Sequence, residues 1–177
     1  RQGKMAILNK LIPLANNEII LFTDARQLFK KDALKKLVSN FSDKTVGCVS
    51  GELIFYSQKT DTAKGINLYW QYEKFIRAQE SRIHSMLGAT GAIYAIRKNL
   101  FTAGPTDIVL DDMYTPFKII QQGYRAIFDE TSHAYDQIAN NPKEEFRRKT
   151  RTLYGNYQIF ALCPEMFNPL KSPVAWQ

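Results

Sequence analysis

The stretch Glu18-Ile19-Ile20-Leu21-Phe22-Thr23-Asp24-Ala25 decides how the rest of the sequence is interpreted. Residues 18–23 predict a short strand that is too apolar on both faces to lie at an exposed edge, and a carboxylate follows it directly. Ligands of open α/β sheets bind beyond the carboxyl ends of such strands, so Asp24 is a candidate ligand for a divalent cation. A capping role in the turn that follows explains Asp24 equally well, because Asp is common in turns.

A basic segment precedes this strand. Gly3-Lys4 opens a helix that the apolar spacing predicts from Met5 to Leu14. A glycine-containing basic helix start followed by a strand that ends in a carboxylate is typical of anion and metal sites in α/β proteins. Because Arg1 is not an initiator residue, we also expect this chain to be a piece of a longer protein.

The remaining pattern alternates strands with helices, which predicts an α/β sandwich with some antiparallel pairing in the later strands. Strands are expected at 46–56, 92–96 and 124–128, and helices at 31–41, 66–83, 111–122 and from Pro142 onward. The predicted buried face of the helix at 66–83 consists of Leu68, Tyr69, Tyr72, Phe75 and Ile76. One face of the last helix carries Phe146, Thr150, Leu153, Tyr157 and Phe160.

Composition places the chain among globular proteins with a single core. It has 177 residues, and Lys plus Arg exceed Asp plus Glu by 7, which favours anionic partners such as phosphates, nucleotide sugars, nucleic acid or an acidic membrane surface. The isolated Cys48 and Cys163 signal neither a zinc site nor a disulfide, and a reducing compartment is expected. No apolar run is long enough to span a bilayer, so the sequence predicts a soluble chain.

Asp111-Asp112 follows the apolar pair Val109-Leu110 and opens a predicted helix. Two adjacent ionised carboxylates repel each other unless a cation, a helix dipole or a reacting proton offsets the repulsion. A catalytic or ligand-binding role is one interpretation. The other is simple N-capping by Asp112, with Asp111 solvated.

On the last helix, Glu144 can pair with Arg148 and Glu145 with Lys149, but Arg151 has no acidic partner at helical spacing. Its neighbours three and four positions earlier are Arg148 and Arg147, and Gly155 lies on the same face. Glycine in a helix interior costs about 1 kcal/mol relative to alanine and allows another backbone or a ligand to come close. An anion site, a membrane-facing basic patch and an ordinary surface all fit this pattern.

Two further features are ambiguous by themselves. Glu73, Arg77 and Glu80 share a helix face, either as an ion-pair ladder or as the polar lining of a cleft. Gly88-Ala89-Thr90-Gly91 interrupts the pattern before a strand, and this turn either approaches a ligand or is an ordinary glycine-containing turn.

Taken in order, these motifs resemble the family 2 glycosyltransferases, most closely the membrane-associated group that includes cellulose, chitin and hyaluronan synthases. The resemblance covers nearly the whole chain. It rests on Gly3-Lys4 with Leu8-Asn9, Phe22-Thr23-Asp24-Ala25, Glu80-Ser81, Gly88 with 91–97, Asp111-Asp112, Gly123-Tyr124-Arg125 and 148–151.

The resemblance implies a GT-A fold, a Rossmann-like mixed sheet flanked by helices, and sugar transfer with inversion from a nucleotide diphosphate donor. Asp24 matches the first carboxylate of the DxD element, which binds donor and metal, Mg²⁺ or Mn²⁺, and Asp112 matches the general base. The residues implied to bind substrates are Lys4, Asp24, Arg26, Gly88, Gly91, Asp111, Arg148 and Arg151.

Some positions depart from the family pattern. Arg26 replaces the second DxD carboxylate, so it contacts phosphate directly or leaves fewer protein groups on the metal. Asp111 replaces a Glu, and Arg148 and Thr152 replace the Gln and Trp of QxxRW, which argues against a strict cellulose-synthase-like processive enzyme. The first strands, which seat the nucleotide base in the complete fold, are absent from the sequence.

We therefore expect residues 1–163 to be the central and C-terminal part of a catalytic domain, and the proline-rich 164–177 to lead to membrane segments at the cytoplasmic face of the cell membrane. The expected partners are a UDP-sugar donor, a saccharide or lipid-linked acceptor and the membrane, without nucleic acid. As an isolated fragment, the chain is expected to be weakly active or inactive. The alternatives are a non-catalytic glycosyltransferase-like module and a basic module that binds polyanions.

Overall fold

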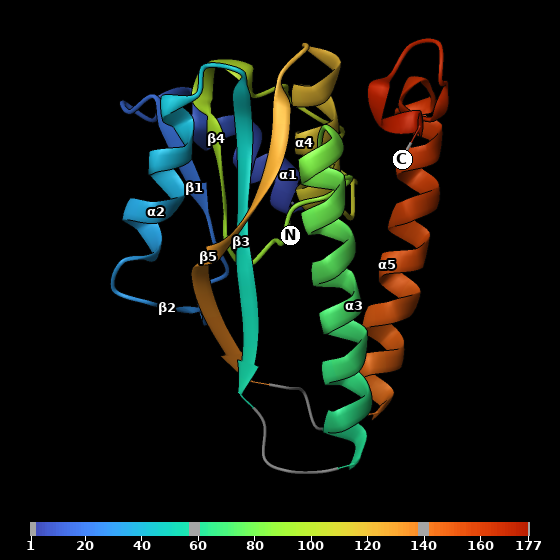
Figure 1. Ribbon diagram of the computed structural model, residues 1–177. Coiled ribbons are helices and arrows are strands. Elements are labelled where there is room, and N and C mark those ends of the chain that lie inside the picture. The colour runs from blue at the N-terminus through green and yellow to red at the C-terminus, as the bar shows by residue number, and fades with distance from the viewer. Residues whose placement is uncertain (1–2, 57–60, 138–141, 177) are drawn as a thin grey trace.

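The computed structural model describes residues 3–56, 61–137 and 142–176 (Figure 1). Its helices and strands follow one another along the chain as α1 (Lys4–Leu11), β1 (Ile19–Phe22), β2 (Leu28–Phe29), α2 (Ala33–Ser39), β3 (Val46–Tyr56), α3 (Asp61–Ile83), β4 (Tyr94–Arg97), α4 (Asp111–Gln121), β5 (Arg125–Gln137) and α5 (Pro142–Leu162). This alternation confirms the α/β class and the order of the predicted elements, with the two-residue β2 as an addition and with β5 continuing to Gln137, well beyond the predicted 124–128.

The five strands form one mixed sheet in the order β1-β4-β3-β5-β2. β3 and β5 are parallel, whereas β4 pairs antiparallel with both β1 and β3, and β2 pairs antiparallel with β5. The expectation that residues 18–23 do not form an edge strand is wrong for the part of the chain described here, because β1 pairs only with β4. Strand β1 is as apolar as expected, but only Phe22 is fully buried.

Helices cover both faces of the sheet (Figure 1). Each face has its own core of buried side chains. On one face α2 places Ala33 and Leu37 against β3 and β4. On the other face, buried residues from α1, α4 and α5 pack together, among them Met5, Phe117 and Ile159. Apolar surface removed from water in these two layers stabilises the sandwich. Met166 and Val174, from the segment that sequence analysis sets apart as a tail, belong to the second core.

The exposed sides of α3 and α5 differ from expectation. Tyr72 and Phe75 of α3 are 62% and 60% exposed, so their prediction as buried residues is wrong, while the side chains of Leu68 and Tyr69 lie outside the described residues. On α5 the stripe of Phe146, Leu153, Tyr157 and Phe160 is exposed, and Gly155 and Ile159 are the buried residues instead. Helical periodicity identifies an apolar face but does not show what covers it.

Candidate active site

The site is built around the first turn of α4. The helix begins at Asp111, and its N-cap residue Leu110 makes no side-chain capping hydrogen bond. Asp111 is 5% exposed, so the interpretation of Asp112 as a cap beside a solvated Asp111 is wrong. Both carboxylates instead stand at the positive end of the helix dipole, which favours negative charge there.

A cation from the start of the chain balances Asp111. Lys4, the first residue of α1, places its Nζ 2.9 Å from Asp111 Oδ2, in an ion pair that lacks hydrogen-bond geometry. The Lys4 side chain is half exposed, whereas the Asp111 side chain is almost completely buried. Gly3 allows this approach, because a Cβ there would lie 2.5 Å from the carbonyl oxygen of Thr106 in the loop that precedes α4.

Asp112 lies against the turn that begins at Gly88. Its backbone oxygen accepts a hydrogen bond of 2.9 Å from the amide of Ala89, and a Cβ added at Gly91 would lie 2.7 Å from its Oδ2. Burial, followed by the charge of Asp111, raises the pKa of Asp112 to about 6, against a partial offset by Lys4. A carboxyl group with this pKa is ionised at neutral pH and retains enough basicity to accept a proton.

The C-terminal end of β1 lies at the same end of the sheet as the turn that contacts Asp112. Phe22 is the cross-strand partner of Tyr94, and their rings stack with centroids 4.4 Å apart. Burial, and next the carboxylates of Asp111 and Asp112, raise the pKa of Tyr94, so its phenol lies near the start of α4. Because β1 and β4 are antiparallel, Asp24 after β1 stands at the edge where Gly91 precedes β4.

The turn after β1 carries two charged residues, Asp24 and Arg26, and of these only Arg26 forms an ion pair within the described part of the chain. Asp24 is partly exposed, and its carboxylate has no hydrogen-bond or ion-pair partner in the described parts of the chain. Arg26 Nε lies 2.9 Å from Asp136 Oδ2 of β5, and Gln27 Nε2 donates to the same oxygen at 3.1 Å. Arg26 thus has a buried acidic partner that its local sequence does not reveal.

Helix α5 supports the loop before the two aspartates. A Cβ at Gly155 would lie 2.5 Å from Leu110 Cγ, so glycine is needed for this close approach. Gln158 accepts a hydrogen bond of 3.0 Å from the amide of Val109 and donates one of 3.3 Å to the carbonyl of Asp107. Arg151 lies one helical turn before Gly155, and both Arg148 and Arg151 are exposed.

Comparison with known proteins identifies this arrangement. The model of glycosyltransferase-like family 2 matches residues 1–155. The chain belongs to glycosyltransferase-like family 2. No curated protein sequence matches it at a significant level.

Solved structures agree with the family. Mannosyltransferase PcManGT from Pyrobaculum calidifontis, in complex with GDP-Man and Mn²⁺, is 27% identical with a TM-score of 0.72, and the match covers 99% of this chain and 49% of that one. Glucosyl-3-phosphoglycerate synthase from Mycobacterium tuberculosis, in complex with Mn²⁺ and UDP-Glc, is 13% identical with a TM-score of 0.56, over 93% and 55%. The family 2 chain therefore has a GT-A fold and spans about half the length of these structures.

Two properties of this family 2 chain concern metal and membrane. Within residues 3–56, 61–137 and 142–176, no cluster of three or more His, Cys, Asp or Glu forms a metal site. Over the same residues, no helix is both long and apolar enough to cross a bilayer.

Sequence reasoning missed several residues that shape the family 2 site. It gave no role to Tyr94, whose pKa is raised by burial and next by the charges of the acidic pair, or to Asp136, which binds Arg26. On α3, Arg77 Nη2 lies 3.7 Å from Glu73, and its Nη1 donates to Thr90 Oγ1. Glu80 accepts a hydrogen bond of 3.1 Å from the amide of Leu87; burial raises the pKa of Glu80, and this hydrogen bond and the charge of Arg77 oppose the rise. Unlike Tyr94 and Asp136, Arg77 was indicated by the sequence, which suggested it as part of the polar lining of a cleft.

Proposed function

We propose that this chain is the central and C-terminal part of an inverting glycosyltransferase, with Asp112 as the general base. The observation that carries the proposal is the state of Asp112: a partly buried carboxylate, with its pKa raised to about 6, packed against the backbone of Gly91. A general base works best when its pKa lies near the working pH. The adjacent Asp111 is neutralised by Lys4, which keeps Asp112 as the available base.

The proposed step forms one bond and breaks one. The acceptor hydroxyl oxygen attacks the anomeric carbon, its proton passes to Asp112, and the bond from that carbon to the diphosphate oxygen breaks. The nucleoside diphosphate leaves from the side opposite the attack, which inverts the anomeric centre. Holding both substrates in line supplies much of the rate acceleration.

A divalent metal, Mg²⁺ or Mn²⁺, is proposed at Asp24. The carboxylate fits, because it follows an apolar strand and is not engaged by any described residue. A single carboxylate together with substrate phosphates is a common protein environment for Mg²⁺. The bound metal would neutralise charge on the departing diphosphate. The solved complexes of PcManGT and of the glucosyl-3-phosphoglycerate synthase contain Mn²⁺, which supports this choice.

We assign the remaining predicted residues to the two substrates. Arg148 and Arg151 are assigned to the diphosphate, because both are exposed and guanidinium groups bind phosphate oxygens well. Lys4, which pairs with Asp111, is assigned to the nucleotide, and Gly88 and Gly91 are assigned to the acceptor side. Arg26 is assigned to the donor side, where its pairing with Asp136 leaves its side chain 70% exposed.

The proposal also includes the identity of the sugar donor and the location of the protein at a membrane. We expect a UDP-sugar, with a GDP-sugar as the competing donor because PcManGT binds GDP-Man. A saccharide or lipid-linked acceptor and a place at the cytoplasmic face of the cell membrane, as in the polysaccharide synthases, follow from the resemblance. The exposed Phe146, Leu153 and Tyr157 of α5, next to exposed arginines, support membrane contact, since interfacial helices combine these residue types.

The decisive test uses the full-length protein that contains this sequence. Asp112→Asn is expected to reduce sugar transfer by a factor on the order of 10² to 10⁴ while donor affinity stays within about twofold. The matched control is Asp107→Asn, an exposed aspartate of the preceding loop, which is expected to leave transfer unchanged. Unchanged turnover by Asp112→Asn would reject the assignment of the base.

A non-catalytic glycosyltransferase-like module is the second candidate. It is favoured by the Arg26–Asp136 ion pair, which places a cation in the position of an expected metal ligand. Such a module would bind a nucleotide diphosphate without metal dependence and would not transfer sugar. Metal-dependent transfer by the full-length protein, measured with UDP- and GDP-sugars, decides against it.

A further inference from the structure

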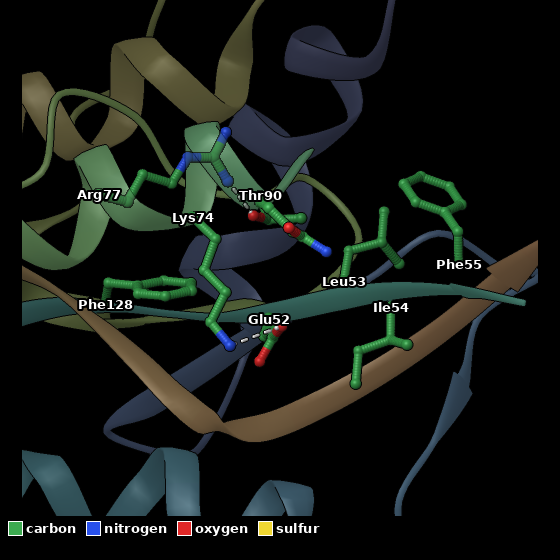
Figure 2. Close-up of a pocket in the computed structure, with 9 residues that line it drawn as sticks. Glu52, Leu53, Ile54, Phe55, Lys74, Arg77, Thr90 and Phe128 are labelled. Carbon is green, nitrogen blue, oxygen red and sulfur yellow. Dashed lines mark hydrogen bonds and ion pairs between the residues drawn. The ribbon is translucent and has the colours of Figure 1, made fainter. Parts of the chain in front are cut away.

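A hollow lies between α3, the second half of β3 and Phe128 of β5 (Figure 2). It is open to solvent on one side, and the space of about 650 Å³ that its walls border includes part of that solvent. Polar groups come from Glu52, Gln71, Lys74, Arg77 and Thr90, and apolar wall from Phe128 and neighbouring residues of β3. We call this hollow the α3 pocket.

The α3 pocket adjoins the proposed base. Thr90 lines it, and the next residue is Gly91, whose Cα faces the carboxylate of Asp112. Figure 2 shows Arg77 reaching from α3 to Thr90, in a hydrogen bond from Nη1 to Oγ1. The amide of Thr90 also donates to Ser50 Oγ at 2.8 Å, which attaches the turn to β3. The charge of Arg77, which lines the pocket, also lowers the pKa of Asp112, so the pocket and the proposed base lie on the same side of this turn.

Charge in the α3 pocket is balanced pair by pair. Lys74 Nζ lies 3.1 Å from Glu52 Oε1, and Arg77 Nη2 lies 3.7 Å from Glu73 Oε2. His133 Nε2 is 3.6 Å from the other oxygen of Glu52. Each cation thus faces a carboxylate, so a phosphate entering here would have to displace one. Strong phosphate sites instead present cations that no carboxylate has already engaged.

The same groups suit a neutral sugar. Sugar hydroxyls both donate and accept hydrogen bonds, and the pocket offers carboxylate acceptors, ammonium and guanidinium donors and the amide of exposed Gln71, which can do both. Phe128 supplies an apolar wall for the C–H face of a ring (Figure 2). Such a mixture of apolar wall and a few convergent polar groups is typical of small-molecule sites.

We infer that the α3 pocket is the acceptor subsite and that it binds a neutral saccharide ring rather than a phosphorylated acceptor. This inference rests on the proposed function, because it places the acceptor hydroxyl beside Asp112. Free glycans and lipid-linked glycans share the chemistry that the pocket recognises. They differ only in what extends from its open mouth.

Steady-state kinetics of the full-length protein test the inference. In Gln71→Ala and Lys74→Ala, the KM for a saccharide acceptor is expected to rise at least tenfold, while the donor KM and the rate of donor hydrolysis by water stay within twofold. The control is Lys35→Ala, an exposed lysine of α2 on the other side of the sheet. An unchanged acceptor KM in both variants, or a parallel loss of donor hydrolysis, would overturn the acceptor role.

Ligand binding separates failure of this inference from failure of the proposed function. Saturation-transfer NMR with the methyl glycosides of mannose, glucose and N-acetylglucosamine measures binding even if no transfer occurs. Binding by the natural protein that is lost in Gln71→Ala supports the pocket. Absence of saccharide binding, or displacement of the saccharide by inorganic phosphate or 3-phosphoglycerate, overturns it. Comparing a free trisaccharide with a polyprenyl-linked one identifies which source the enzyme uses.

Discussion

Gly91 and Asp112 are in such close contact that a single added methyl group at Gly91 would lie 2.7 Å from Asp112 Oδ2. The backbone of Gly91 does not require glycine, since its φ is not in the left-handed region. Space for the carboxylate, rather than backbone freedom, therefore explains glycine at this position.

Gly91→Ala is expected to displace the Asp112 carboxylate and to reduce kcat by at least about tenfold, because small displacements of a reacting group have large effects on rate. The comparison is Gly88→Ala in the same turn, where the new methyl group would lie 3.7 Å from Met113, an ordinary contact. The pH dependence of kcat/KM reports the Asp112 pKa in both variants. If Gly88→Ala shifts that pKa as much as Gly91→Ala does, the steric explanation fails.

Asp112 also makes stability depend on pH. Its pKa is raised to about 6 from the ordinary 3.8, so between these values the folded state keeps a proton that the unfolded state releases. Unfolding free energy is therefore expected to fall as pH rises from about 4 to about 6, and this contribution stays lost above pH 6.

Asp112→Asn removes this dependence. At pH 8 the variant is expected to be more stable than the natural protein by an amount on the order of 1–2 kcal/mol, after allowance for solvent screening of a partly exposed group. Urea unfolding at pH 4 and pH 8 measures the difference. Equal stability of the two proteins at both pH values would show that the pKa of Asp112 is not raised in the folded state.

Lys4 and Asp111 are expected to shift the Asp112 pKa in opposite directions. Asp111 raises that pKa and Lys4 lowers it, each through its charge. In Asp111→Asn the acid limb of the pH–rate profile is expected to move to lower pH, and in Lys4→Met to higher pH. Transfer rates measured from pH 4.5 to 8.5 show both limbs. Movement in the same direction would contradict the electrostatic explanation.

Gly155→Ala tests whether α5 positions the loop before the aspartates. Alanine gains about 1 kcal/mol in helix propensity, but its methyl group would lie 2.5 Å from Leu110 Cγ, and overpacking typically costs about 1–3 kcal/mol. We expect a net loss of up to about 2 kcal/mol in unfolding free energy, measured by urea denaturation. Asn156→Ala on the same helix is the control. A stabilised Gly155→Ala variant would show that Leu110 moves freely.

The secondary structure was largely predictable from the sequence, because it depends on neighbours within a few residues. The strand predicted at 46–56 is β3 from Val46 to Tyr56, and Gly123, which directly follows the helix predicted at 111–122, has a φ of 85°. β2 was missed because two residues are too few to show the alternation of apolar and polar side chains that predicts a strand. Its position depends on pairing with Tyr135 and Ala134 of β5. The order of short motifs along the chain was likewise enough to indicate the family, which the family model confirmed.

The sequence by itself determined the strand and helix pattern, the family and the identity of the acidic pair, since each is written in local spacing or motif order. Only the tertiary structure decided that Lys4 neutralises Asp111, that Arg26 binds Asp136 across 110 residues, and that α3 and β3 enclose a pocket beside Thr90. Burial and charge act through space and not along the chain. The raised pKa of Asp112 therefore exists only once the fold has removed water from its carboxylate and placed Asp111 and Lys4 beside it.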